Sequence, residues 1–417
     1  MRSEKLLDSL KGPGFDSPHL HNVKSSKKFD YIIIGGGIVG LSTALKLQEA
    51  NKKVLILEKE KTVALHQSGR NSGVLHSGIY YKPNSFKSNL CIRGRELMLE
   101  FLNDNNVPYR LEGKIVVDQN MNNIESLYER SQLLEMSGVK ILQETELIDK
   151  EPNSKILQGL FVPQAGVVDY KIVAQTMSRI FQDDGGEIEY FQEIVDIAEN
   201  KDEKTISSKK DSFTADFLIN CAGLFSDKVA KLDGLTPKVK IIPFRGEYYE
   251  IRPQKSYLLN NMIYPIADPD LPFLGIHLTK TVDGRIEAGP NAVLAFAREG
   301  YTWSKFNLSQ TLETISYKGM VKLGRKYIKT GLDEMYRSLN KSAFVKEVNR
   351  LIPDIESEDL VKRPAGVRAQ AVSENGELLD DFLFEEGNKS LHVLNAPSPA
   401  ATASLAIGEY ISSKVLN

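Results

Sequence analysis

The chain has 417 residues, 41% hydrophobic and 26% charged, which excludes a disordered or fibrous protein and allows two or three domains. Its 53 basic and 55 acidic side chains leave a net charge of −2, so no global field attracts nucleic acid. Cys91 and Cys221 lack the spacing of a zinc site, and no apolar run reaches the roughly 18 residues that cross a bilayer, so we expect a cytoplasmic protein without metal.

A glycine-rich turn opens the folded part of the chain. Residues 29–34 are almost wholly apolar, as in a strand buried on both faces of a parallel sheet, and they lead into "GGGIVG" at 35–40. Residues 38–50 then have helical spacing, and a second buried strand, 53–57, ends at Glu58. This order predicts a Rossmann-type dinucleotide-binding unit.

The turn predicts the cofactor contacts of that unit. A helix N-terminus over close-packed glycines binds a pyrophosphate, and a carboxylate after the second strand accepts hydrogen bonds from the adenosine ribose. Glu58 would repel the 2′-phosphate of NADP, which leaves NAD and FAD open. The expected cofactor contacts of this part are Gly35, Gly37, Ile38, Gly40 and Glu58.

The next stretch, "LHQSGRNSGVLHSGIYYKPNS" at 65–85, favours FAD over NAD. An NAD domain would usually continue with another ordinary helix, whereas these residues are polar and small, as in a loop that crosses a flavin. We expect contacts with pyrophosphate, ribitol or flavin ring from Ser68, Arg70, Asn71, Ser72, Gly73, His76 and Ser77.

These residues resemble the D-amino-acid-oxidase superfamily of FAD enzymes and, within it, the L-2-hydroxyglutarate dehydrogenase/oxidase family. The resemblance runs from about residue 29 to the C-terminus. Its further motifs are "PFRGEYY" at 243–249, "PFLGIHLT" at 272–279, "GPNAVLAFAREGY" at 289–301, "PAGVRAQ" at 364–370 and "NAPSPAAT" at 395–402.

The resemblance implies an α/β fold with a Rossmann-type FAD-binding domain and a discontinuous α+β substrate domain on a mixed or antiparallel sheet. We expect residues 1–28 to be a flexible extension. The FAD-binding domain is expected at 29–105, 155–235 and 362–417, and the substrate domain at 106–154 and 236–361, with a helical insert near 304–350.

The resemblance also implies cofactor contacts from two further segments. Ala222 and Gly223 end the strand that closes over the adenosine in this superfamily. A C-terminal helix points its N-terminus at the flavin, where its dipole stabilises negative charge on the reduced ring. The small residues expected there are Ser398, Ala400, Ala401 and Thr402.

The implied reaction is FAD-dependent oxidation of a 2-hydroxy acid, with hydride moving from Cα to flavin N5 and the hydroxyl proton moving to a base. His76 is the first candidate for the base, with a flavin-tuning contact or a covalent tether as alternatives. His277 is a rival base or carboxylate ligand, unless it is simply satisfied within a strand.

For the substrate carboxylate we favour Arg368, because arginine binds carboxylates bidentately. Arg245, Tyr264 and Lys82 are weaker candidates, and Arg245 has a domain-bridging salt bridge as an alternative role. A dicarboxylate requires a second cationic site, for which the sequence gives no geometry.

The resemblance implies L-2-hydroxyglutarate as the dicarboxylate substrate, 2-oxoglutarate as the product, and quinone, oxygen or an electron-transfer protein as the electron acceptor. An amino-acid or amine oxidase of the same fold and a non-catalytic flavin-binding protein are the alternatives. The helical insert is either a solvated surface or a peripheral contact with the inner face of a membrane.

Overall fold

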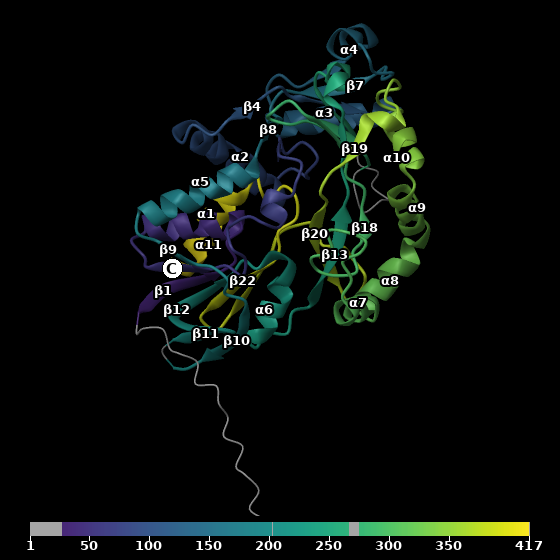
Figure 1. Cartoon of the computed structure of the whole chain (residues 1–417). Helices are drawn as coiled ribbons and strands as arrows, with labels where there is room; N and C mark the ends of the chain where they lie inside the picture. Colours follow the sequence, from purple (N-terminus) through teal and green to yellow (C-terminus); the bar gives the residue numbers. More distant parts are fainter. Residues whose placement is uncertain (1–26, 202, 267–274, 417) are drawn as a thin grey trace, which may run out of the picture.

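The computed structural model describes residues 27–201, 203–266 and 275–416, which form two eight-stranded sheets with their covering helices (Figure 1). The expected N-terminal extension lies outside the described residues except for its last two positions. The predicted α/β class and the mixed second sheet are confirmed.

The first sheet is built on parallel strands, as the apolar runs predict. Its order is β10-β11-β12-β1-β2-β9, with β22 beside β12 and β21 beside β22. Parallel pairing joins β1 to β2 and to β12, and β12 to β22. The strands are β1 (Lys28–Ile34), β2 (Val54–Leu57), β9 (Glu187–Glu189), β10 (Ile194–Glu199), β11 (Lys204–Ser208), β12 (Ser212–Asn220), β21 (Leu383–Gly387) and β22 (Ser390–Asn395).

Helices cover both faces of this sheet. On one face, α1 packs beside α5 and α11, and α2 packs against α11 (Figure 1). Leu41, Ile33 and Ile407 belong to the core on this face, and Val229 of α6 belongs to the core on the opposite face. The helices are α1 (Ile38–Glu49), α2 (Phe86–Asp104), α5 (Tyr170–Asp183), α6 (Ser226–Leu232) and α11 (Ser404–Leu416).

The second sheet has the order β19-β14-β17-β16-β15-β5-β7-β6 and is antiparallel except where β5 pairs with β15. Its strands are β5 (Lys114–Val117), β6 (Lys140–Leu142), β7 (Gly159–Val162), β14 (Tyr249–Ile251), β15 (Met262–Pro265), β16 (His277–Lys280), β17 (Ile286–Gly289) and β19 (Leu360–Lys362). α3 (Met121–Leu133) and α4 (Glu144–Lys150) connect its first strands.

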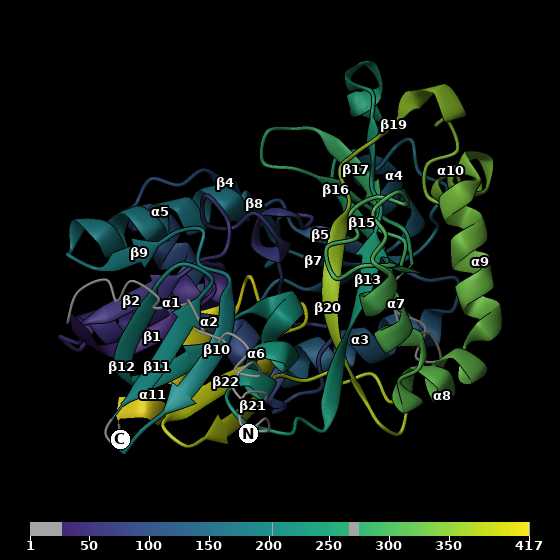
Figure 2. The ribbon, with the colours of Figure 1, turned by 60° about the horizontal axis from the view of Figure 1, so that its bottom comes forward.

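The second sheet, the small sheet of β13 (Val239–Gly246), β18 (Val293–Leu294) and β20 (Gly366–Ser373), and their helices form the second unit of the chain, and the first sheet with its helices forms the first unit. A column of helices lies at the outer edge of the second unit, within the stretch 304–350 where a helical insert was expected (Figure 2). The helices are α7 (Leu308–Ile315), α8 (Lys318–Lys326), α9 (Ile328–Leu339) and α10 (Lys341–Val348). α10 anchors the column, because its buried Phe344 packs on Tyr249 with ring centroids 4.6 Å apart. None of the helices in the described residues is both long and apolar enough to span a bilayer.

Two three-stranded sheets complete the fold. One has β13 between β18 and β20, and the other has β8 (Gly166–Val168) between β3 (Val74–Leu75) and β4 (Tyr109–Arg110). Residues 239–251 therefore divide at Gly246 between two sheets, because β13 belongs to one of these small sheets and β14 to the second eight-stranded sheet. We expected the chain to return to the FAD-binding domain at residue 155. β7 (Gly159–Val162) still belongs to the second sheet, so the chain leaves that sheet a few residues later.

Candidate active site

The turn after β1 brings backbone segments closer together than a side chain would allow. Gly35 has a φ of +109°, and a Cβ on it would lie 2.5 Å from the carbonyl oxygen of Cys221. A Cβ on Gly40 would lie 2.1 Å from the Gly35 oxygen. The glycines thus let α1 begin directly after β1, so that its N-terminus can face an anion; in this structure the Ile38 amide donates to the Ser68 hydroxyl at 2.9 Å.

Glu58 is held beside this turn by two backbone amides. Its Oε2 accepts a hydrogen bond from the Gly36 amide at 2.7 Å, and its Oε1 accepts one from the Glu60 amide at 2.9 Å. The Glu58 side chain borders a large cavity that the glycine turn also lines, and the residue is 7% exposed. A fixed, partly accessible carboxylate at the end of β2 fits the ribose hydroxyls of an adenosine.

One large cavity of about 990 Å³ runs between the two units and contains most of the predicted site. Its volume lies at the upper end of the usual range for ligand sites, about 300 to 1,000 Å³, as an extended dinucleotide requires. The predicted residues that line it are Gly35, Gly37, Ile38, Glu58, Ser68, Arg70, Asn71, Ser72, His76, Ala222, Gly223, Tyr264, His277, Arg368, Ser398, Ala400 and Ala401.

Four predicted cofactor contacts do not line the cavity but support it. Gly40 provides the close approach in the turn, and a Cβ on Gly73 would lie 2.5 Å from the Val168 oxygen. Thr402 is fully buried, and its Oγ1 accepts a hydrogen bond from the His76 amide at 3.1 Å. Ser77 is 3% exposed. These residues shape the loop and hold His76 in place.

His76 lies where the loop after β3 meets the turn before α11. Its Nε2 is 3.2 Å from the Ser398 hydroxyl. Burial, followed by the charges of Lys114, His277 and Lys87, lowers the pKa of His76 to about 3. The imidazole is therefore neutral at working pH, as a proton acceptor must be. Burial and the nearby positive charges make it a weak base, and an anion bound in the cavity would raise its basicity by offsetting those charges.

His277 begins β16 and faces the same cavity. Its ring stacks on Tyr264 with centroids 4.0 Å apart, and its Nδ1 lies 3.1 Å from the Gly275 carbonyl. A carbonyl only accepts, so Nδ1 carries the proton and Nε2 is left as an acceptor. Burial is the main cause that lowers the pKa of His277 to about 3, although the Gly275 hydrogen bond opposes it.

The two predicted arginines lie on neighbouring strands but on opposite sides of them. Arg368 on β20 is directly opposite Phe244 on β13, so Arg245, one position later, projects to the other face. Arg368 lines the cavity beside Tyr248. Arg245 is 1% exposed, pairs with Glu247 through Nε at 3.2 Å and stacks on Trp303.

The structure therefore does not bring Arg245 to the cavity, and its ion pair with Glu247 accounts for its burial. Lys82 is exposed and does not line the cavity either. Cys221 lines the cavity, but burial raises the pKa of its thiol to about 12, which excludes a reactive thiolate.

Several residues near His76 and His277 were not among the predicted site residues. Tyr80, Tyr81 and Tyr248 line the cavity, as does Lys87, whose Nζ donates to Asp380 Oδ1 at 2.7 Å. Lys114 lies behind Tyr80 and Tyr264. The pair "YY" at 80–81 was visible in the polar loop, but no sequence signal distinguishes Lys114 from an ordinary strand residue.

An acidic cluster lies near the glycine turn. Glu60, His66 and Glu299 place three potential ligand atoms within 4.8 Å of one another. The Lys59 ammonium forms ion pairs with both carboxylates, with Glu60 Oε1 at 2.7 Å. This lysine neutralises the cluster, which is therefore explained as an ion-pair network.

Comparison with known proteins identifies the family. Residues 30–414 match the DAO family, described as FAD dependent oxidoreductase. The chain belongs to this family. It is an FAD-dependent oxidoreductase, and the glycine turn, Glu58 and the long cavity fit that cofactor.

Named relatives cover nearly the whole chain. It is 48% identical over 386 residues to L-2-hydroxyglutarate dehydrogenase of Indibacter alkaliphilus, covering 91% of this chain and 97% of that protein. It is 43% identical to the enzyme of that name from Escherichia coli K12, covering 93% of each. It is 39% identical to the mitochondrial human enzyme of that name, covering 94% of this chain and 89% of that protein.

Two solved structures share the fold of this chain. L-α-glycerophosphate oxidase from Mycoplasma pneumoniae with FAD bound has a TM-score of 0.76 at 20% identity, covering 94% of this chain and 95% of that one. Glycine oxidase from Geobacillus kaustophilus has a TM-score of 0.71 at 17% identity, covering 93% and 95%. These two likenesses support the fold alone.

Proposed function

We propose that this chain oxidises L-2-hydroxyglutarate to 2-oxoglutarate. The observation that carries the proposal is that His76, His277 and Arg368 line one cavity with the glycine turn and Glu58. Oxidation of a hydroxy acid requires a proton acceptor and a carboxylate ligand beside the cofactor. The relatives named L-2-hydroxyglutarate dehydrogenase, at 39–48% identity, supply the choice of substrate.

In the proposed reaction Arg368 holds the C1 carboxylate, and His76 accepts the hydroxyl proton as the C2–O bond becomes a carbonyl. When bound, FAD supplies the two-electron acceptor for the hydrogen that leaves C2. His76 is suited to this role because its imidazole is neutral and is held through its backbone amide and Nε2. His277 orients the hydroxyl through its acceptor Nε2, since its Nδ1 is occupied by Gly275.

The test is to reduce the purified holoenzyme with candidate substrates under anaerobic conditions. Loss of the flavin absorbance measures the reduction. L-2-hydroxyglutarate should bleach the flavin and yield 2-oxoglutarate. The chain would instead be an amine or amino-acid oxidase if glycine or a D-amino acid bleached it, with ammonia as a product.

Two histidine variants separate the proposed roles. H76N should slow flavin reduction about 100- to 10,000-fold, the usual contribution of a general base, whereas H277N should mainly raise KM. If H277N lost more kcat than H76N, His277 would be the proton acceptor and His76 the residue that orients the hydroxyl. Flavin content, measured for each variant, controls for loss of the cofactor.

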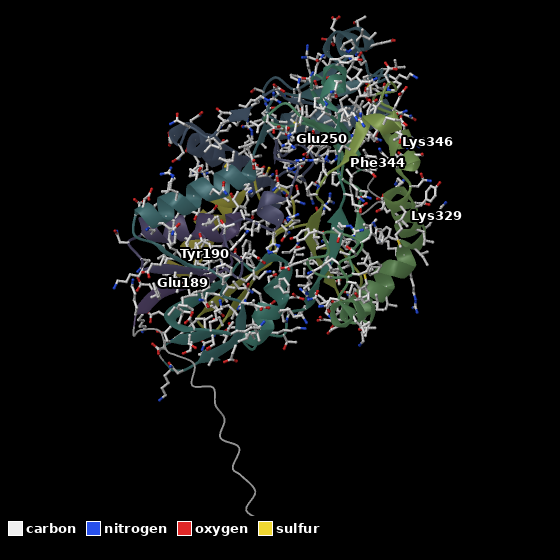
Figure 3. The ribbon with its side chains drawn as sticks, viewed as in Figure 1. Glu189, Tyr190, Glu250, Lys329, Phe344 and Lys346 are labelled. Carbon is white, nitrogen blue, oxygen red and sulfur yellow. The ribbon has the colours of Figure 1, made fainter. Side chains whose placement is uncertain are left out.

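We also propose that the helical column makes peripheral contact with an anionic membrane, where a quinone would accept the electrons. α9 exposes an apolar stripe at helical spacing, formed by Ile328, Leu332, Tyr336 and Leu339, each 60–69% exposed. Basic residues accompany it, and Lys329 lies at the outer edge of the molecule (Figure 3). Four more basic residues lie on the preceding helix α8: Lys318, Lys322, Arg325 and Lys326.

Co-sedimentation with vesicles tests this contact. Wild type should sediment with vesicles of phosphatidylglycerol and phosphatidylcholine, and I328S/L332S/L339S should not. The matched control L133S/L157S/F191S removes three exposed apolar side chains from other surfaces and should sediment like wild type. Failure of wild type to sediment, or equal loss in the control, would end the membrane proposal.

A further inference from the structure

Lys114 on β5 is a buried lysine behind the part of the cavity wall that Tyr80 and Tyr264 form. It is 1% exposed, and its Nζ lies 4.2 Å from the ring centroid of Tyr80 and 5.2 Å from that of Tyr264. Both tyrosines line the cavity. The ammonium therefore lies one side-chain layer behind the wall, in contact with the faces of two of its rings.

This ammonium has no acidic partner within ion-pair distance among residues 27–201, 203–266 and 275–416. The other buried lysines have one: Lys87 pairs with Asp380, and Lys204 pairs with Glu199 and Asp233, each at 2.7 Å. A buried ammonium without a counter-charge is costly, and burial lowers the pKa of Lys114 to about 7. An anion at the cavity wall would complete the missing pair.

The lysines that line the cavity, and Arg70 with them, already have partners within the protein. Lys87 pairs with Asp380 as above, and Lys228 pairs with Glu313. Lys59 pairs with Glu60 and Glu299, and Arg70 donates to the Leu65 carbonyl and stacks on Tyr301 at 4.2 Å. With Arg368 assigned to the first carboxylate, Lys114 is, among the residues that the structure describes, the positive charge that remains for a second one.

Within the part of the chain that the structure describes, no negatively charged group near Lys114 competes for its ammonium. The titratable groups around it are His76, Tyr80, Lys87, Cys91, Arg95, Tyr264 and His277. Burial raises the pKa of the Cys91 thiol to about 12, so this thiol stays neutral.

We propose that Lys114 is a specificity-determining residue that selects hydroxy acids with a second carboxylate, by placing a positive charge behind Tyr80 and Tyr264. The proposal rests on the proposed function, since it assigns the second cationic site that a dicarboxylate requires. It acts on the distal carboxylate and leaves the chemistry at C2 to His76, His277 and Arg368.

The test compares kcat/KM for L-2-hydroxyglutarate with that for its C5-amide, which has the same shape without the second charge. K114M should lower the value for the dicarboxylate about 10- to 100-fold, the scale of one charge pair several ångströms apart in a protein, and should leave the amide unchanged. K114R should keep the preference for the dicarboxylate. K52M, with the same change at an exposed lysine before β2, should match wild type. Equal losses on both substrates in K114M would overturn the proposal.

Calorimetry on the wild-type holoenzyme gives a second reading that needs neither a variant nor turnover. At pH 8, Lys114 is mostly neutral in the free enzyme because its pKa is about 7. Glutarate binding should therefore take up a proton, up to one per site, and binding of its mono-amide should not. Equal uptake for the two ligands would overturn the role of Lys114, whereas normal glutarate binding without oxidation of L-2-hydroxyglutarate would overturn the proposed function instead.

Discussion

The ion pair between Asp227 and Arg298 joins the two units and should dominate the stability of their interface. Arg298 Nη1 lies 2.5 Å from Asp227 Oδ1, and Nη2 lies 2.8 Å from Oδ2, which is a bidentate pair. Asp227 is 0% exposed and Arg298 4% exposed. Asp227 belongs to α6 on the first sheet, and Arg298 follows β18 of the second unit.

The variant D227N keeps the shape of the side chain and removes its charge. The Arg298 guanidinium would then stay buried without a counter-charge, which costs about 3 to 5 kcal/mol in other proteins. This is a large share of the roughly 5 to 15 kcal/mol by which folded proteins are stable. The exposed pair Arg179–Asp183 on α5, with both side chains 62% exposed, is the matched control, and D183N should cost about 0 to 1 kcal/mol.

Urea unfolding of the holoenzyme, followed by circular dichroism and by flavin fluorescence, measures both variants. D227N should lower the unfolding midpoint strongly and release FAD at lower urea, and D183N should leave both near wild type. The double variant D227L/R298M should recover part of the loss, because it leaves no buried charge. A midpoint for D227N equal to that of D183N would refute the reasoning.

Four further predictions concern the site. Gly40→Ala should lose FAD, because the new Cβ would lie 2.1 Å from the Gly35 oxygen, whereas Gly324→Ala, at an open position in α8, should retain it; equal flavin absorbance in the two variants would contradict this. Because the pKa values of His76 and His277 are lowered to about 3, kcat/KM should show no acid limb near pH 6.5. The same two histidines titrate near pH 6.5 in the unfolded chain. Their contribution to the free energy of unfolding is therefore fully present above pH 6.5 and should be lost as the pH falls toward 3. A rise in the unfolding midpoint over this pH range would contradict the assignment. Arg368→Met should weaken binding of glutarate about 10- to 150-fold at normal flavin content, as expected for lost hydrogen bonds to a charged group, and unchanged binding in a titration would remove Arg368 from the site.

Short contiguous motifs made the cofactor half predictable. The glycine turn, Glu58 and the loop to His76 lie within residues 35–76, where α1, β2 and the segment through β3 define their geometry. Residues that depend on strand pairing could not be predicted in this way. Lys114 reads as an ordinary strand residue until β5 pairs with β15, which brings Val116 opposite Tyr264 and sets Lys114 two positions away.

Arg245 shows the same limit in the opposite direction. Its charge and motif made it a candidate, but the register between β13 and β20 directs its side chain away from Arg368. The division of residues 239–253 between two sheets likewise depends on partners far away in the chain. Periodicity predicts a strand but contains no information about its partner.

The last helix of the chain also has a consequence for synthesis on the ribosome. α11 packs on α1, with the Tyr31 hydroxyl donating to the Val415 carbonyl at 2.8 Å, and a Cβ on Gly408 would lie 2.7 Å from the Ser42 backbone. Part of the apolar surface of β1 and α1 therefore stays uncovered until α11 has been synthesised, and contacts of such long sequence separation form slowly. Nascent chains should become able to retain FAD only after α11 has left the ribosome, so chains truncated before Ser404 should contain no flavin.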